Sequence, residues 1–200
     1  VKRLPQFGGG FAEAMNFALT NVSTQFVFFL DDPLRVLPAN HFIEVINQAK
    51  ETLSKGKIGV LGIGSSMEPN TGLLVTTGRD AATKKVAGLF APSFALNLEG
   101  MRLTGGFRTF GTTAVLSCLD LSLRCEEQGW KSVLIETEKL LCPATSGKDY
   151  LHAAGKHAIA YFGRIWKRKP VSLNPKFPPK EEQVGETADY QEWIRLCDTI

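Results

Sequence analysis

The sequence predicts an α/β fold with a central mixed, mostly parallel sheet and helices on both faces. Short apolar runs, which are typical of buried strands, alternate along the chain with segments of helical period. The run at residues 26–30, FVFFL, carries large apolar side chains on both faces, which is typical of a central parallel strand. With 200 residues, of which 44% are hydrophobic, the chain is long enough to bury the core of one such domain.

The first elements alternate between helix and strand. Apolar residues recur with a helical period over 11–20, directly after three glycines. The strand at 26–30 follows. Pro38 is well placed to open a second helix, and Gly56 marks its end. Residues 57–64, KIGVLGIG, then predict a second buried strand.

The middle of the chain contains shorter segments. Residues 73–77, LLVTT, predict a strand that ends before Gly78. The apolar run 86–96 is interrupted by Pro92, which makes it an edge strand, a bulge or a break. A short helix over 98–103 ends before a pair of glycines.

The next elements centre on the helix predicted over 112–128, in which leucines recur at three and four residues and which Gly129 ends. Residues 131–137 predict a strand, and residues 140–141 a second, short one. An amphipathic helix is expected over 149–166, because its apolar residues line one side.

Composition limits the function and the location. Residues 1–166 form one domain, and residues 167–200, which are charged and proline-rich, form a C-terminal arm with one short helix. The net charge of +3 gives no support for a nucleic-acid binder. The four cysteines show no C-x-x-C pair and no zinc spacing, so free thiols in a reducing compartment are expected.

No targeting signal is visible. No apolar run approaches the ~20 residues of a membrane span, and no signal peptide is recognisable. We therefore expect a cytoplasmic protein. The basic run at residues 167–169 offers a peripheral contact to an anionic membrane surface, with a solvated tail as the alternative.

Two carboxylates, Asp31 and Asp32, directly follow the apolar run at 26–30. Open α/β sheets bind ligands at the carboxyl ends of their strands. Paired hard oxygens at such a position suit Mg²⁺ or Mn²⁺ and, through the metal, a diphosphate. The alternative is that the two acids only end the strand and begin a turn, because Asp is common in turns.

Three glycines, Gly8 to Gly10, precede the first helix, and a helix N-terminus attracts anions. No G-x-x-x-x-G-K-[ST] pattern follows, so a flexible turn is favoured. The competing hypothesis is a nucleotide-binding domain of another α/β class, with these glycines as its anion loop.

Five stretches suggest a family because of their order. They are GGGFAEAMNFAL, FVFFLDDPLRVLP, APSFALNLEGMRLTGGF, DLSLRCEEQGW and YFGRIWKRK. In this order they resemble the later two-thirds of a family-two glycosyltransferase with the GT-A fold, over about residues 8–169. The resemblance implies a partial GT-A-like (nucleotide-diphospho-sugar transferase-like) sandwich in residues 1–166. It also implies transfer of a sugar from a nucleotide-diphosphate sugar to a glycan or polysaccharide acceptor, with Mg²⁺ or Mn²⁺.

The resemblance assigns a metal and diphosphate role to two acids. Asp31 matches the first Asp of the family's Asp-x-Asp motif and Asp32 its middle position, while Pro33 stands where the second Asp is expected. Cys142 lies near the place of a family His that binds metal or phosphate. A thiolate can bind a metal, and a buried inert thiol is the alternative.

The resemblance also assigns the acceptor side. Gly105, Gly106 and Phe107 match the family's acceptor-side loop, for which a tight structural turn is the alternative. Asp120 and Arg124 match the Asp-Leu-x-x-Arg that follows the family's catalytic Glu-Asp pair.

The catalytic pair itself is replaced by Ser117 and Cys118. Asp120 is then the nearest acid that could act as general base. Residues two apart on a helix, however, point about 200° apart, so Asp120 cannot simply take the place of Cys118. A solvated or Arg-paired helix residue is the slightly favoured alternative for Asp120.

The family's nucleoside-binding strands precede the segment that matches from Gly8 onward, and they are missing here. Their absence would leave an exposed apolar sheet edge, which proteins normally avoid. We therefore expect a truncated chain, or an oligomer partner or other segment that covers the edge. Two functions stay open: a glycosyltransferase or a fragment of one, which is favoured, and a catalytically inactive GT-A-like binding or scaffold protein.

Overall fold

The computed structural model describes most of the chain between residues 10 and 173. The described ranges are 10–29, 35–36, 39–65, 73–78, 86–90, 93–110, 114–137, 140–141 and 154–173. In this part of the chain, no helix is long and apolar enough to cross a membrane.

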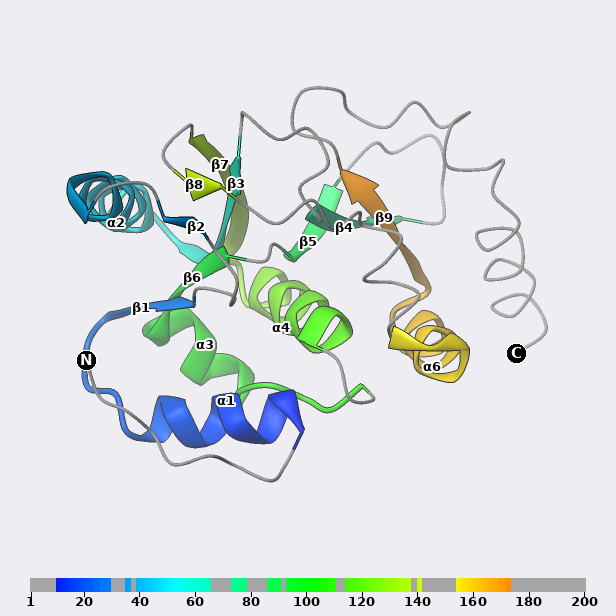
Figure 1. Ribbon diagram of the computed structural model, residues 1–200. Coiled ribbons are helices and arrows are strands. Elements are labelled where there is room, and N and C mark those ends of the chain that lie inside the picture. The colour runs from blue at the N-terminus through cyan, green and yellow to red at the C-terminus, as the bar shows by residue number, and fades with distance from the viewer. Residues whose placement is uncertain are drawn as a thin grey trace.

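A four-stranded sheet in the order β1-β6-β3-β7 forms the centre of the fold (Figure 1). Its strands are β1 (Phe26–Phe29), β6 (Ser93–Asn97), β3 (Ile58–Ser65) and β7 (Lys131–Thr137). β6 pairs antiparallel with both β1 and β3, whereas β3 and β7 are parallel. Strands β1, β3 and β7 therefore run in one direction and β6 runs against them. The α/β class and the mixed sheet are confirmed.

β1 differs from the central, fully buried parallel strand that its sequence suggested. It lies at the end of the described sheet, pairs antiparallel with β6, and its four residues are half-buried. Phe26 and Phe28 pack on one hydrophobic cluster, and Val27 and Phe29 on another. An apolar pattern reports that both faces of a strand are covered, but it carries no information about how many strands pair with it. A partner for the outer edge of β1 stays a prediction.

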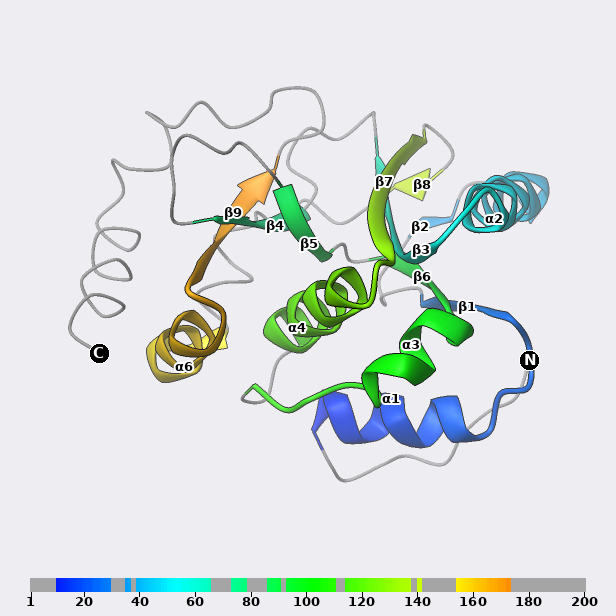
Figure 2. The same cartoon turned by 180° about the vertical axis from the view of Figure 1, so that it is seen from behind.

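Helices cover both faces of this sheet (Figures 1 and 2). The helices are α1 (Phe11–Thr20), α2 (Ala39–Ser54), α3 (Leu98–Thr104) and α4 (Ala114–Glu127). On one face, side chains of α1, α3 and α4 form a cluster with Phe94 and Leu96 of β6. On the other face, side chains of α2 pack against Leu61 and Ile63 of β3.

Two smaller sheets lie beside the central one. β4 (Leu73–Gly78) pairs antiparallel with β5 (Val86–Phe90) and with β9 (Arg168–Leu173). β2 (Arg35–Val36) pairs with β8 (Leu140–Leu141). The apolar run at 86–96 thus forms two strands in different sheets, so the break at Pro92 was the correct alternative.

The first residues of the expected C-terminal arm form a strand. Residues 168–173 are β9, which pairs antiparallel with β4 along its length. Helix α6 (Lys156–Trp166) leads directly into this strand through Lys167. The physical reason is that backbone pairing with a neighbouring strand satisfies the amide groups of a segment whose composition is charged. Residues 174–200 lie outside the described residues.

Candidate functional site

The predicted site residues fall into two groups. Asp31, Asp32 and Cys142 lie outside the described residues, and so does Pro33. The remaining predicted residues are all described; they are Gly105, Gly106, Phe107, Asp120 and Arg124. Most of them belong to one polar network between α3, α4 and α6. The structure therefore brings together the predicted loop and the predicted helix motif.

The centre of the network is an ion pair on one face of α4. Asp120 is 0% exposed and Arg124 is 6% exposed. Oδ2 of Asp120 accepts from Nε of Arg124 at 2.8 Å and pairs with its Nη2 at 2.7 Å. The spacing of four residues places both side chains on the same face of the helix. A pair of this kind is stable in the interior only if the remaining polar atoms are also satisfied.

The second oxygen of Asp120 is bound from another helix. Nε1 of Trp166, at the end of α6, donates to Oδ1 at 3.0 Å. Nη1 of Arg108 lies 3.9 Å from the same oxygen, with its side chain 58% exposed. Both carboxylate oxygens are therefore engaged, and the acid links α4 to α6.

The other donors of Arg124 bind the loop after α3. Nη2 donates to the carbonyl oxygen of Gly106 at 2.6 Å, and Nη1 donates to the carbonyl oxygen of Thr104. The last carbonyls of a helix have no partner within the helix, and a cation there also interacts favourably with the helix dipole. Arg124 thus holds the end of α3 and the loop that follows it in one conformation.

The loop needs glycine at two successive positions. Gly105 and Gly106 have φ angles of 77° and 87°, a region that side chains with a Cβ rarely adopt. A Cβ on Gly106 would also lie 2.6 Å from Oδ1 of Asn16. The loop is therefore a tight turn, and the glycines have a structural reason to be there.

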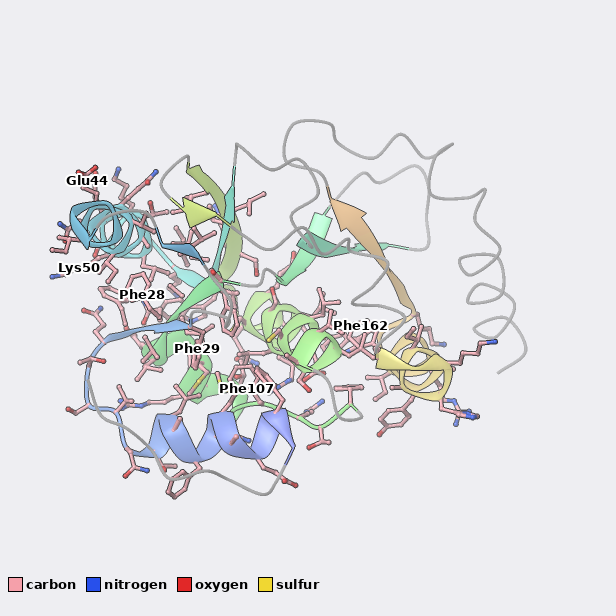
Figure 3. All side chains as sticks on the ribbon, viewed as in Figure 1. Phe28, Phe29, Glu44, Lys50, Phe107 and Phe162 are labelled. Atoms are coloured by element: carbon pink, nitrogen blue, oxygen red, sulfur yellow. The ribbon has the colours of Figure 1, made fainter. Side chains whose placement is uncertain are left out.

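Asn16 on α1 holds the loop from the opposite side. Its Oδ1 accepts from the backbone N–H of Phe107 at 2.8 Å, and its Nδ2 donates to the carbonyl oxygen of Phe107 at 2.9 Å. The ring of Phe107 is buried and meets Phe11 edge to face at 5.6 Å between centroids. Figure 3 shows Phe107 between α1 and the rest of the core. The loop is thus bound by α1 on one side and by α4 on the other.

These contacts favour the Arg-paired interpretation of Asp120 over both alternatives. The residue is not solvated, because no part of it is exposed. A general base must reach the proton that it accepts, and it must be free to take it. To accept a proton, Asp120 would have to give up its hydrogen bonds from both Arg124 and Trp166. Its geometry is therefore that of a structural residue that holds these two side chains in place.

The positions of the expected catalytic acids offer no base either. Ser117 and Cys118 are both buried in α4. Burial raises the pKa of the Cys118 thiol well above its usual range. Burial also raises the pKa of Cys125, further along α4, to about 11. Neither thiol is a thiolate at neutral pH, and the thiolate is the reactive form.

The predicted metal site is untested by the described residues. Among them, no group of three or more His, Cys, Asp or Glu side chains is placed to hold a metal ion. The acids for which the metal was predicted, Asp31 and Asp32, lie outside those ranges. The donor chemistry of two neighbouring carboxylates still suits Mg²⁺ or Mn²⁺.

The N-terminus of α1 does not favour the anion-loop hypothesis. Oε2 of Glu13 accepts from the backbone N–H of Gly10 at 3.0 Å. A carboxylate in the first turn already interacts with the positive end of the helix. A phosphate bound at the same place would meet a like charge. Gly8 and Gly9 lie outside the described residues.

Sequence reasoning missed three residues of the network: Asn16, Arg108 and Trp166. Asn16 carried a signal, because it is a polar residue beside the apolar stripe of α1. Trp166 carried a weaker one, since a half-buried indole N–H usually has a partner. Nothing in the sequence linked either residue to its partner.

Comparison with known proteins adds no family assignment. No family model matches the chain, and no curated protein matches it. The roles of the residues are therefore derived from their chemistry and their geometry.

Proposed function

We propose that the chain is a GT-A-like glycosyltransferase domain, or a piece of one. Its reaction is transfer of a sugar from a nucleotide-diphosphate sugar to a glycan or polysaccharide acceptor. The observation that carries the proposal is the edge of the central sheet at which β1, β3 and β7 end. This edge is the usual ligand position in open α/β sheets.

The strand register defines this edge. Phe29, the last residue of β1, pairs with Phe94 of β6. Ile63 of β3 pairs with Ser93 of β6 on one side and with Ile135 of β7 on the other. Three carboxyl ends therefore lie in a row, with the amino end of β6 among them.

The order of the chain supports a role for the two acids at that row. Asp31 and Asp32 stand in the sequence between β1, which ends at Phe29, and β2, which begins at Arg35. In the proposal, Asp31 and Asp32 hold Mg²⁺ or Mn²⁺ against the diphosphate. When bound, the metal neutralises the charge that develops on the leaving diphosphate.

The network around Asp120 supports the acceptor side of the proposal. An acceptor must be held in one geometry for transfer, which requires a rigid surface. Asn16 and Arg124 bind the loop from Gly105 to Phe107 from two sides, which makes it rigid, and Gly105 is its exposed residue. Asp120 acts in this proposal as the positioning partner of Arg124.

Ligand-dependent thermal stability tests the proposal. The intact chain is heated with UDP-, GDP- and dTDP-sugars, with and without Mn²⁺. A ligand at 100 times its Kd stabilises the folded state by about 2.7 kcal/mol, which raises Tm by several degrees. We expect a shift for one nucleotide class, with Mn²⁺ required.

Matched variants locate the site. The double variant Asp31→Asn with Asp32→Asn is expected to lose the shift. Glu127→Gln, which removes an exposed charge at the end of α4, is expected to keep it. If no nucleotide sugar raises Tm at millimolar concentration, the proposal is wrong.

A catalytically inactive GT-A-like binding protein is the second candidate, and one observation favours it. The described residues of α4 place no free carboxylate where the resemblance expects the base, because Asp120 is fully engaged and Ser117 and Cys118 are not acids. An assay of nucleoside diphosphate release distinguishes the glycosyltransferase from the inactive binding protein. A thermal shift without release, with every acceptor tested, supports the binding protein; release that Asp31→Asn abolishes supports the enzyme.

A further inference from the structure

Arg108 is an exposed cation beside the glycine loop that follows α3. Its side chain is 58% exposed, and its Nη1 lies 3.9 Å from Oδ1 of Asp120. That distance is too long for a hydrogen bond, and the same oxygen already accepts from Trp166 at 3.0 Å. An ion pair of this length with a largely exposed partner contributes little to stability. Stability of the fold therefore gives little reason for a cation at this position.

The backbone that carries Arg108 is fixed on both sides. On one side, the side chain of Asn16 forms two hydrogen bonds with the backbone of Phe107. On the other side, the ring of Phe110 is buried and lies 5.5 Å from the ring of Phe162, between centroids. A guanidinium on such a segment starts from a defined point, which lowers the entropy cost of binding a ligand.

The charges around Arg108 do not cancel. The network contains one carboxylate, that of Asp120, and two guanidinium groups, those of Arg124 and Arg108, so its net charge is +1. Arg124 already compensates Asp120, because its Nε and Nη2 lie 2.8 and 2.7 Å from Oδ2. Arg124 is buried, whereas Arg108 is exposed to solvent. The positive charge that has no counterpart among the described residues is therefore the one at the surface.

The surface beside Arg108 is polar and open. Gly105 and Thr109 are exposed, and the two residues that follow Gly105 are buried. Residues 105–109, GGFRT, contain no acid. A glycine lets a ligand approach the backbone closely, and a threonine hydroxyl both donates and accepts hydrogen bonds. This surface suits a ligand that is rich in hydroxyl groups and carries an acid.

We propose that this surface selects an acceptor that carries a singly charged acid, and that Arg108 binds the acid. The inference rests on the proposed glycosyltransferase function, in which the loop lies on the acceptor side. The planar guanidinium of Arg108 matches two oxygens of a sugar carboxylate or of a phosphodiester. One negative charge on either group balances the net charge of the network. A phosphate monoester carries about −1.5 to −2 at pH 7, which would leave excess negative charge beside Asp120.

Binding of defined oligomers tests the inference with the full chain and no nucleotide. The probes are hexagalacturonic acid, which carries carboxylates, a glycerol phosphate hexamer, which carries phosphodiesters, and neutral maltohexaose. Isothermal titration calorimetry measures each Kd at about 50 mM NaCl, at which exposed charges are only partly screened. We expect one of the acidic oligomers to bind about ten times more tightly than maltohexaose, because hydrogen bonds to charged groups are the stronger ones. The tighter of the two identifies the acid.

Three variants place the contact. Arg108→Gln is expected to reduce the affinity for the acidic oligomer to that for maltohexaose. Arg108→Lys keeps the charge but loses the planar fork, so an intermediate affinity is expected. Lys50→Gln removes one exposed positive charge from α2, which covers the opposite face of the central sheet (Figure 3), and is expected to bind as the unmodified chain does. Urea denaturation of each variant checks that the chain remains folded.

Two results would overturn the inference. The first is equal binding of the acidic and the neutral oligomers by the unmodified chain. The second is an equal loss of affinity in Arg108→Gln and Lys50→Gln, which would show an effect of net charge alone. Failure of the glycosyltransferase proposal is a different result, because it shows as the lack of a thermal shift with every nucleotide sugar.

Discussion

Trp166 donates its indole N–H to Asp120 at 3.0 Å, across the interface of α6 and α4 and over a sequence separation of 46 residues. Arg124 binds the other oxygen of the same carboxylate from one helical turn away. Asp120 thus joins a local ion pair to a long-range contact. Through Arg124, the same network reaches the carbonyl oxygen of Gly106 and sets the conformation of the loop.

Removal of Asp120 should strongly destabilise the fold. Asp120→Ala leaves Arg124 as a buried, uncompensated cation, for which we expect a loss of about 3–5 kcal/mol in the free energy of unfolding. Urea denaturation measures it. Replacing both residues by leucine should cost less than the sum of the two single changes. Arg108→Gln is the control and should change stability by less than about 1 kcal/mol, because Arg108 is largely exposed.

Trp166→Phe tests the long-range contact by removing the indole donor while keeping an aromatic ring. We expect a loss of about 1–3 kcal/mol, because Oδ1 of Asp120 loses its closest donor. The same substitution in the Asp120→Ala background should cost clearly less. Equal costs in both backgrounds would show that Trp166 acts through packing alone.

Gly106→Ala should distort the loop. The residue has a φ of 87°, and its new Cβ would lie 2.6 Å from the Asn16 oxygen that accepts from Phe107. We expect a loss of about 1–3 kcal/mol from backbone strain. Gly56→Ala is the matched control, because a Cβ there has no atom within 4 Å. A Gly106→Ala variant as stable as the Gly56→Ala variant would contradict the geometry of the loop.

Stability should fall at alkaline pH because of the buried thiols. Burial raises the pKa of Cys125 to about 11, so the folded state favours the neutral thiol. That stability is fully present below the thiol's pKa in the unfolded chain, about 8.5, and it is lost as pH rises from there through the folded value. Each such thiol steepens the fall by at most about 1.4 kcal/mol per pH unit.

Unfolding of the protein and of Cys125→Ala at pH 7, 9 and 10.5 measures this contribution. The variant should lose less stability than the unmodified chain between pH 9 and 10.5, whatever other groups titrate there. Parallel pH profiles would show that Cys125 is not shielded from water. At pH 8, slow modification of Cys118 and Cys125 by a thiol reagent is expected in the folded chain and fast modification in urea.

Much of the local structure could be predicted, because periodicity and chain-breaking residues act over a few positions. The helix at Ala114–Glu127 and the strand at Lys131–Thr137 match their apolar patterns closely. The split of the run at 86–96 followed from Pro92 alone. The pair of Asp120 with Arg124 was also foreseeable, since four residues is one helical turn.

The contacts that complete the site could not be predicted. Asn16 binds the backbone of Phe107 from 91 residues away, and no local pattern encodes such a distance. The position of β1 at the end of the described sheet was equally hidden, because apolar faces look alike in central and outer strands.

The sequence by itself determined the α/β class, the place of most helices and strands, and the residue types available for chemistry. The tertiary structure alone decided what Asp120 does. Arg124 on α4 and Trp166 on α6 both donate to its carboxylate, and through Arg124 it stabilises the glycine loop. The reason is physical. Side-chain identity sets what a group is able to bind, whereas burial and the partners that distant segments bring decide what it does bind.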